Sequence, residues 1–382
     1  MNQIYTIISI RPKPLRAGGE ENSISAGLEI YKDIADNVIA VTINNSVSEI
    51  SHDFMKLKLK PNRSNPKNTN WVKFLTKFLL LKLIICDPYM RENTKFSYCL
   101  EVQNLINKFP SAIVINETSG MFPLSIFSRR RVSRSNNFEP LHSFRENRGL
   151  KRYLYLLPKI SGVILERWLS NILSISYRDM NYYKKFRSPK RLSFLPLRHL
   201  ILANKNTLYS KREFIGGVAY LSSTFNVKHN KDGVEFFVNK VFNKDELSNV
   251  ILNIYGAKTL KSFERRNVIV HGWVDDIEDI YTKNSIFLSA FGGTGQQSKI
   301  FEPMCRGKVV ICNPRLVEGQ NLIAGRHYLP ALCENDYIRH ILDLTNNPDK
   351  LHFIGRNAFD FCADLFSYEK NIKTLVNFLN IS

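Results

Sequence analysis

The sequence lacks paired cysteines. Its six cysteines stand singly, and no Cys-x-x-Cys motif or Cys/His cluster occurs. This pattern argues against a disulfide framework and a zinc site, and it favours a reducing compartment. No uninterrupted apolar stretch reaches about 18 residues, so we expect no membrane span. The opening residues, 1–14, lack a charged segment, a following apolar segment and a cleavage site, so we expect no secretory signal peptide and a cytoplasmic protein.

Motifs for metal and cofactor binding are also absent. The sequence has no P-loop, no Gly-x-Gly-x-x-Gly, no His-Glu-x-x-His and no Asp-x-Asp. We therefore expect neither a metal nor a resident cofactor. The Asp275-Asp276 pair is better explained by one aspartate capping the following helix. His271 is expected to be structural.

Positive charge is concentrated in one half of the chain. The 382 residues carry a formal net charge of +20. Residues 1–200 hold 32 basic and 15 acidic residues, a balance of +17, whereas residues 201–382 hold 22 and 19, a balance of +3. The basic half implies a polyanionic partner: an anionic membrane, a phosphorylated substrate or nucleic acid.

Short apolar strands alternate with amphipathic helices along the chain, which predicts two α/β halves with parallel sheets, joined near residues 200–212. The predicted strands are 4–10, 37–43, 111–117, 171–177, 213–221, 249–256, 267–272, 285–290 and 308–312. The predicted helices are 23–35, 71–85, 232–242, 275–283 and 368–380.

The segment FGGTGQQSKIFEPMC (291–305) follows a buried-type strand. Its glycines allow a sharp turn and the close approach of a ligand. Thr294 with Gln297 fits a capping box that starts a helix near Gly295, and Ser298 as N-cap starts it later. Either helix start presents unpaired N–H groups to an anion such as phosphate.

Two charged residues complete this pattern. Lys299 adds a cation in the first turns of the helix. Glu302 lies three residues further on, on a neighbouring part of the same face, where its carboxylate can accept two hydrogen bonds from a sugar diol. The pattern favours a nucleotide-sugar pocket. The alternative is an ordinary glycine turn with Glu302 as an exposed helix residue.

Five segments of the second half, in their order, resemble the carboxyl-terminal domain of GT-B glycosyltransferases of the group 1, GT4-like type. They are FIGGVAYLSSTFNVKHNKDGVEFF (214–237), LNIYG (252–256), HGWVDDIEDIY (271–281), FGGTGQQSKIFEPMCRGKVVIC (291–312) and EGQNLIAGRHYL (318–329). The resemblance covers about residues 213–380 and implies a GT-B fold. In that fold two Rossmann-like α/β domains face each other across a cleft, and a carboxyl-terminal helix crosses back to the amino-terminal domain.

The resemblance also implies domains and site residues. We expect an acceptor-binding domain at 1–205, a donor-binding domain at 206–366 and a crossing helix at 367–382. Glu302 matches the glutamate that holds the nucleotide ribose, and Lys299 joins it in the catalytic set. The expected donor-binding residues are Gly18, Gly19, Gly216, Gly217, Gly292, Gly293, Thr294, Gly295, Gln296, Lys299 and Glu302.

Two positions depart from the family pattern. Thr294 stands where many members carry a second glutamate that touches the donor sugar. The arginine that usually follows the first strand of this domain is missing, and Lys228 and Lys231 are the two candidates to replace it.

Residues 71–85 are consistent with a helix at a membrane interface, with Lys73 and Lys77 stacked on one face and Lys82 nearby. The alternative is a core helix with snorkelling lysines. Residues 51–200 hold 28 basic and 9 acidic residues, a balance of +19, which favours a peripheral position on an anionic membrane. Further basic clusters lie at 55–63, 128–134 and 182–192.

We therefore expect a retaining glycosyltransferase of cell-surface polysaccharide or glycolipid synthesis, peripheral on the cytoplasmic membrane face. Its partners are a nucleotide-sugar donor, a saccharide or lipid-linked acceptor and an anionic membrane surface. One alternative is a nucleotide-sugar epimerase of the same fold. Another is a non-catalytic module that binds a polyanion or nucleic acid, although no RNA-binding motif is present.

Overall fold

The computed structural model divides the chain into two compact units. Unit 1 comprises Met1–Leu202 with Glu369–Ser382, and unit 2 comprises Ala203–Tyr368. The sequence-based boundaries, after residues 205 and 366, fall within a few residues of these divisions. The structure describes residues 4–12, 19–43, 48–49, 58–59, 71–86, 90, 95–136, 138–146, 149–206, 217–259, 261–292 and 295–380.

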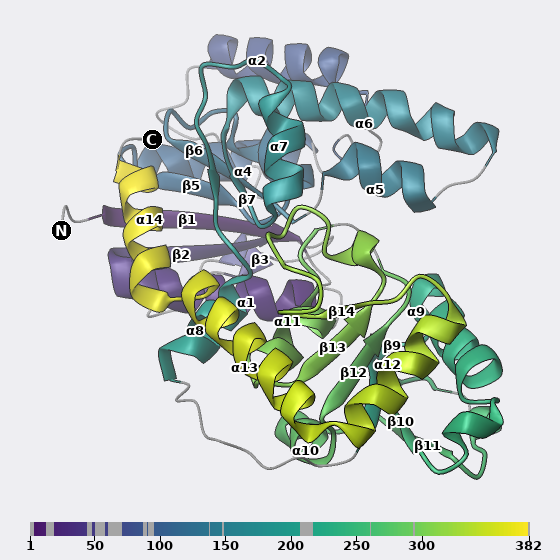
Figure 1. The fold of residues 1–382 in the computed structure, drawn as a ribbon. Coiled ribbons are helices and arrows are strands. Elements are labelled where there is room, and N and C mark those ends of the chain that lie inside the picture. The colour runs from purple at the N-terminus through teal and green to yellow at the C-terminus, as the bar shows by residue number, and fades with distance from the viewer. Residues whose placement is uncertain are drawn as a thin grey trace. The chain divides into compact units, whose positions relative to one another are not determined.

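Unit 1 is built on a six-stranded parallel sheet with the strand order β2-β1-β5-β6-β7-β8 (Figure 1). Its strands are β1 (Ile4–Pro12), β2 (Ala35–Ile43), β5 (Ile113–Asn116), β6 (Arg131–Ser135), β7 (Asn171–Ser174) and β8 (Leu192–Phe194). A two-stranded antiparallel pair, β3 (Ser48–Glu49) and β4 (Lys58–Leu59), stands apart from this sheet.

Helices cover the sheet of unit 1, and strands β5, β6 and β7 are buried along nearly their whole length. The helices are α1 (Gly19–Ile34), α2 (Trp71–Ile84), α4 (Phe96–Lys108), α5 (Glu139–Glu146), α6 (Leu150–Leu169), α7 (Tyr177–Lys184) and α8 (Arg198–Asn206), whose last residues enter unit 2. α2 and α4 share one buried cluster with Ile8 and Ile10 of β1. Tyr177 of α7 stacks on Phe194 of β8, with ring centroids 3.9 Å apart.

The helix α14 (Tyr368–Asn380) belongs to unit 1, although it follows unit 2 in sequence. Arg130 donates to the carbonyl of Leu379 at 2.9 Å, and Arg191 donates to the carbonyl of Phe378 at 3.0 Å. These bonds satisfy carbonyls in the last turn of the helix. The predicted return of the last helix to the amino-terminal domain is therefore confirmed.

Unit 2 contains a second six-stranded parallel sheet, with the order β11-β10-β9-β12-β13-β14. The strands are β9 (Val218–Thr224), β10 (Leu252–Ala257), β11 (Val268–Gly272), β12 (Ile286–Ser289), β13 (Val309–Cys312) and β14 (Leu329–Pro330). Numbered from one along the chain, this order is 3-2-1-4-5-6, the arrangement of a Rossmann sheet.

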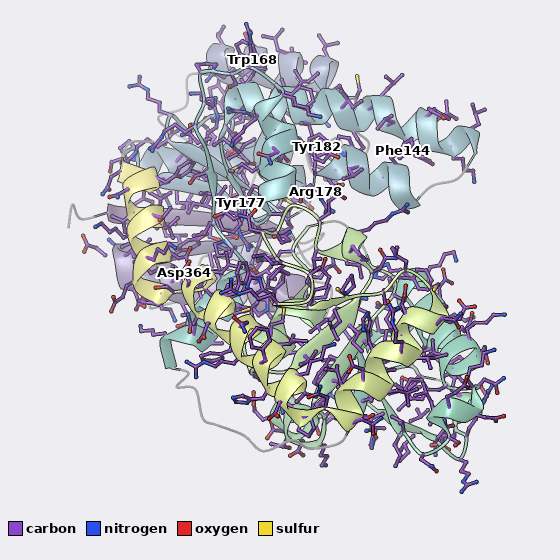
Figure 2. The ribbon with its side chains drawn as sticks, in the orientation of Figure 1. Phe144, Trp168, Tyr177, Arg178, Tyr182 and Asp364 are labelled. Atoms are coloured by element: carbon purple, nitrogen blue, oxygen red, sulfur yellow. The ribbon has the colours of Figure 1, made fainter. Side chains whose placement is uncertain are left out.

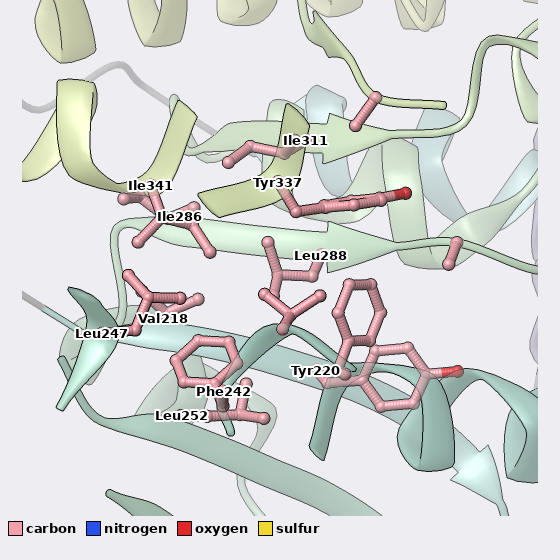
Figure 3. Packing of buried hydrophobic residues seen from close by; sticks show 14 of the residues in the cluster. Val218, Tyr220, Phe242, Leu247, Leu252, Ile286, Leu288, Ile311, Tyr337 and Ile341 are labelled. Carbon is pink, nitrogen blue, oxygen red and sulfur yellow. The ribbon is translucent and has the colours of Figure 1, made fainter. Parts of the chain in front are cut away.

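The core of unit 2 forms where helices pack on this sheet. The helices are α9 (Lys228–Phe236), α10 (Ile277–Lys283), α11 (Ser298–Met304), α12 (Glu334–Asn346) and α13 (Pro348–Leu365). Figure 3 shows Leu288 of β12 between Ile311 of β13 and Tyr220 of β9, with Tyr337 of α12 above the sheet. Both units thus have the predicted Rossmann-like architecture.

Two local expectations were wrong. The segment 128–134, expected as an exposed basic cluster, contains most of the buried strand β6, and Arg134 is only 1% exposed. The helix expected at 232–242 begins earlier, at Lys228, and its end widens into a π-helical turn at Phe237–Val241. Among the described residues no helix is long and apolar enough to cross a membrane.

Candidate functional site

The loop after β12 lies where the strand order of unit 2 reverses. β9 is the first strand of this sheet in the chain, and it is flanked by β10 on one side and β12 on the other. In an open parallel sheet a crevice forms at such a point, outside the carboxyl ends of the strands. Residues 290–297 connect β12 to α11, so this loop and the start of α11 occupy the position where ligands bind in such sheets.

Two loop glycines stand where a side chain would be strained or crowded. Gly295 has a φ of 81°, in the left-handed region that glycine adopts without strain. A Cβ on Gly292 would lie 3.0 Å from Gln297 Oε1 and 3.1 Å from a methyl carbon of Leu316. The path of the loop therefore depends on glycine at position 295, whereas a side chain at position 292 would require Gln297 and Leu316 to shift by a few tenths of an ångström. The predicted loop residue Gln296 is buried.

The other predicted glycines are not gathered at this loop. Gly217 lies before the amino end of β9, where a Cβ would stand 2.3 Å from the carbonyl oxygen of Lys283. β9 and β12 are parallel, so the amino end of β9 and the carboxyl end of β12 lie at opposite edges of the sheet. Gly217 therefore lies at the edge opposite to Gly292, where it allows close packing. Gly19 is the first residue of α1 in unit 1. Four predicted residues lie outside the described residues: Gly18, Gly216, Gly293 and Thr294.

The helix α11 begins between the two predicted starts. Its first residue is Ser298, and Gln297 is the N-cap, with an extended φ of −95° and ψ of 110°. Gly295 cannot belong to the helix because of its positive φ. The amide of Ile300 donates to the carbonyl of Gln297 at 3.0 Å, which closes the first turn.

Lys299 folds back onto the loop that precedes its helix. Its ammonium group donates to the carbonyl oxygen of Phe291 at 2.6 Å. The side chain is half-buried, and burial lowers the pKa of Lys299 to about 8. Lys299 thus brings a cation to the loop and ties the first turn of α11 to the end of β12.

Glu302 is held by residues of α10. The hydroxyl of Tyr281 donates to Glu302 Oε2 at 3.2 Å. Burial raises the pKa of the Tyr281 phenol, and the neighbouring Glu302 carboxylate raises it further, so the phenol remains a donor. The guanidinium of Arg306 lies 4.1 Å from the Tyr281 ring centroid and donates to Glu278 at 2.5 Å and to the Glu302 carbonyl at 3.1 Å. Sequence reasoning did not single out Tyr281, although it ends the quoted segment 271–281.

The two lysines considered as replacements for the missing arginine both lie on α9 and are exposed. Lys228 pairs with Asp232 at 2.6 Å, and Lys231 lies 3.8 Å from Glu235. Both are i,i+4 ion pairs within one helix, of the kind that stabilises an exposed helix by a few tenths of a kcal/mol, roughly. These contacts leave both candidates open.

The structure agrees with two expectations, one for the start of α10 and one for His271 at the end of β11. Asp276 is the N-cap of α10, and its carboxylate accepts from the amide of Glu278 at 2.9 Å. His271 stacks on Tyr255 with ring centroids 4.5 Å apart, and its Nε2 lies 2.8 Å from Asn253 Oδ1. Burial lowers the pKa of His271, so the ring is neutral near pH 7 and acts as a structural group.

Unit 1 contains a buried ionic cluster that sequence reasoning missed. Glu117 follows β5 and accepts from Ser9 of β1 at 2.6 Å and from Arg198 of α8. Arg198 also donates to the hydroxyl of Tyr31 in α1. Burial alone would raise the pKa of Glu117, but the Arg198 guanidinium holds it below its usual value. Gly27 makes room for this arginine, since a Cβ there would lie 2.1 Å from Arg198 Nη1.

Comparisons with known proteins agree with the fold of both units. Residues 218–347 match a sequence model of the family described as glycosyl transferases group 1. No curated protein matches the sequence. Among solved structures, sucrose-phosphate synthase from Thermosynechococcus elongatus aligns with a TM-score of 0.65 and 12% identity, over 97% of each chain.

Two further structures show the same likeness. Anabaena Alr3699/HepE in complex with UDP aligns with a TM-score of 0.62 and 12% identity, over 98% of this chain and 100% of that one. TarM aligns with a TM-score of 0.57 and 14% identity, over 74% of this chain and 58% of its own length. The chain thus spans little more than half of TarM, and at such identities these likenesses show the fold alone. Residues 218–347 of the carboxyl-terminal domain are therefore similar to the group 1 glycosyl transferases, and the chain as a whole has the GT-B fold.

Proposed function

We propose that the chain is a glycosyltransferase that moves a sugar from a nucleotide-sugar donor to a saccharide or lipid-linked acceptor, with retention of configuration. The observation that carries this proposal is the position of the Lys299–Glu302 turn at the switch point of a domain that matches the group 1 family. The Alr3699/HepE structure aligned above is a complex with UDP, which supports a nucleoside diphosphate as the ligand of this fold in the present chain.

In this proposal Glu302 accepts hydrogen bonds from the ribose diol, and Tyr281 orients the carboxylate. The bond between the anomeric carbon and the diphosphate oxygen breaks, and that carbon bonds to the acceptor hydroxyl oxygen. The electron pair leaves with the diphosphate, and the hydroxyl proton passes to the departing phosphate oxygen. Lys299 and the loop N–H groups stabilise the departing charge, so catalysis is chiefly positioning and electrostatic stabilisation.

The proposal extends to where the enzyme works. Residues 51–200 carry 28 basic and 9 acidic residues, which supports a peripheral position on an anionic, cytoplasmic membrane surface. An acceptor in cell-surface polysaccharide or glycolipid synthesis would be met there. We include no metal, since the chain has no Asp-x-Asp motif.

A thermal-shift panel with UDP, GDP, dTDP and CMP tests the donor site. We expect one of these nucleotides to raise the unfolding temperature of the purified chain, because a ligand that binds only the folded state stabilises it. Glu302→Ala should abolish this rise. Glu264→Ala removes an equally charged, exposed residue of unit 2 and serves as the matched control.

The outcomes separate the parts of the proposal. A nucleotide that stabilises Glu302→Ala as strongly as the unaltered chain would exclude the ribose role of Glu302. No stabilisation by any of the four nucleotides would contradict the donor site itself and favour a non-catalytic binding module.

A further inference from the structure

The helix α6 exposes an apolar stripe along its length. Leu150, Leu154 and Leu157 are 74%, 63% and 71% exposed, and Ile164 and Trp168 continue the line. These positions recur at three, four and seven residues, so they lie on one side of the helix. Large apolar side chains exposed in a continuous row mark an interaction surface, whereas single exposed ones are ordinary.

The helix α2 adds a second apolar strip. Its inner side packs Phe74 into the core of unit 1, and Phe78 packs against the same core. Its outer side exposes five further apolar residues: Val72, Leu75, Leu79, Leu80 and Leu83. The sequence left open whether α2 is an interfacial helix or a core helix. In the structure one side of α2 packs on the core of unit 1 and the opposite side is exposed.

The two helices lie side by side. Ile85, just after α2, shares a buried cluster with Leu165 and Leu169 from the last turns of α6. Figure 2 shows Trp168 of α6 close to α2. The outer residues of α2 and the α6 stripe together form what we call the α2–α6 face.

The charges of these helices indicate what the α2–α6 face meets. α2 contains three lysines and no acidic residue. α6 contains one acidic residue, Glu166, and four basic residues, of which Arg167 is buried and Lys159 pairs with Glu139 of α5 at 3.5 Å. Glu166 is fully buried and bonded to Ser133, so neither helix presents a carboxylate to the exterior. A second copy of the chain would bring like charges together at this face, whereas an anionic surface would attract them.

We propose that the α2–α6 face docks unit 1 onto an anionic lipid bilayer, with its apolar residues in the acyl boundary and its basic residues among the head groups. This inference rests on the proposed function and names the surface that reaches the membrane. Trp168 and Tyr153 are exposed on or beside the α6 stripe, and such amphipathic rings favour the level of the head groups. The lysine ammonium groups stay near water while their stems cover apolar surface, as in other interfacial helices.

Vesicle co-sedimentation of the full chain tests the proposal. We expect binding to vesicles of phosphatidylglycerol and phosphatidylcholine in equal parts, and at least fivefold weaker binding to pure phosphatidylcholine. The triple variant Leu150→Gln, Leu154→Gln and Leu157→Gln should lower the partition coefficient at least tenfold. The matched control is Leu332→Gln with Phe353→Gln, which changes residues of unit 2 that are 74% and 56% exposed and should bind as the unaltered chain does.

A second measurement locates the contact. Trp71 lies at the start of α2, so the measurement is made in a Trp71→Phe background. Brominated lipids should then quench the fluorescence of Trp168, so adding Trp168→Phe should remove most of the quenching and adding Trp273→Phe, in unit 2, should keep it. Binding that is absent, indifferent to lipid charge or unchanged in the triple variant would overturn the proposal. A dimer seen by light scattering that the triple variant dissociates would assign the face to a second copy instead.

The nucleotide thermal shift is measured on the same samples. Retained nucleotide stabilisation with failed vesicle binding would refute the α2–α6 face alone. The reverse result would leave the face standing and refute the donor site.

Discussion

The phenol of Tyr281 offers the sharpest test of how Glu302 is positioned. Tyr281→Phe removes one oxygen atom and leaves the ring, which is fully buried and packs 5.2 Å from the ring of Phe287. The change deletes the 3.2 Å hydrogen bond to Glu302 Oε2 and leaves the hydrogen bond from Arg306 to Glu278 in place. The variant should therefore fold normally, with a carboxylate that is less firmly oriented.

The magnitude follows from the setting of this bond. A hydrogen bond to a charged group contributes about 1.5–3 kcal/mol. Glu302 is half-buried, so water can partly replace the phenol and the lower end of that range applies. A loss of about 1.4 kcal/mol is a tenfold change in affinity. We expect Tyr281→Phe to weaken nucleotide binding about tenfold, less than Glu302→Ala does.

Isothermal titration with the stabilising nucleotide measures this effect. Tyr220→Phe is the matched control, because it deletes another buried phenol of unit 2 that donates to the carbonyl of Asn230 at 3.1 Å. It should alter the unfolding temperature without altering nucleotide affinity. If Tyr281→Phe binds the nucleotide as tightly as the unaltered chain while Glu302→Ala does not, the positioning role of Tyr281 is refuted.

Three further perturbations test the local geometry. Folding lowers the pKa of Lys299 from 10.5 to about 8. Between these pH values the unfolded chain binds one more proton than the folded chain, so the free energy of unfolding should rise with pH from about 8 to about 10.5. Urea unfolding should show this rise as a growing difference in unfolding free energy between the unaltered chain and Lys299→Met. Gly27→Ala should destabilise unit 1 by about 3 kcal/mol, because the new Cβ displaces buried Arg198; an unchanged urea midpoint would contradict this. Gly256→Ala should cost about 2 kcal/mol, since its φ is 147° and its Cβ would lie 2.3 Å from the carbonyl oxygen of Ser222; thermal unfolding measures the loss.

The alternation of apolar strands and amphipathic helices was enough to predict both sheets, because burial on two faces leaves a continuous apolar run in each strand. It failed at β6, whose sequence RVSRS contains two arginines. Arg134 is buried there and donates to Ser23 at 2.7 Å, while Arg131 donates to the carbonyls of Ile126 and Ser128. Partners from other elements make this strand possible, and a strand read in isolation does not show them.

The sequence predicted those parts of the candidate site whose residues are close together in the chain. Lys299 and Glu302 are three residues apart on one helix, so their spacing was sufficient to group them. Tyr281 lies 21 residues away from Glu302 and reaches it only through the packing of α10 against α11. Gly217, expected as a ligand contact from its place next to a strand, makes room for Lys283 and Asn284, and this close packing is also not visible in the sequence.

The path of the chain sets an order of completion during synthesis. It leaves unit 1 after residue 202 and returns at residue 369, so unit 2 is one continuous stretch and unit 1 is interrupted. Domains generally fold as units while the chain emerges from its amino end. Unit 2 therefore has all its residues before unit 1 does. Arg130 and Arg191 can form their hydrogen bonds to the carbonyls of Leu379 and Phe378 only after α14 has been synthesised. Unit 1 is therefore the first unit to be synthesised in part and the last to be completed.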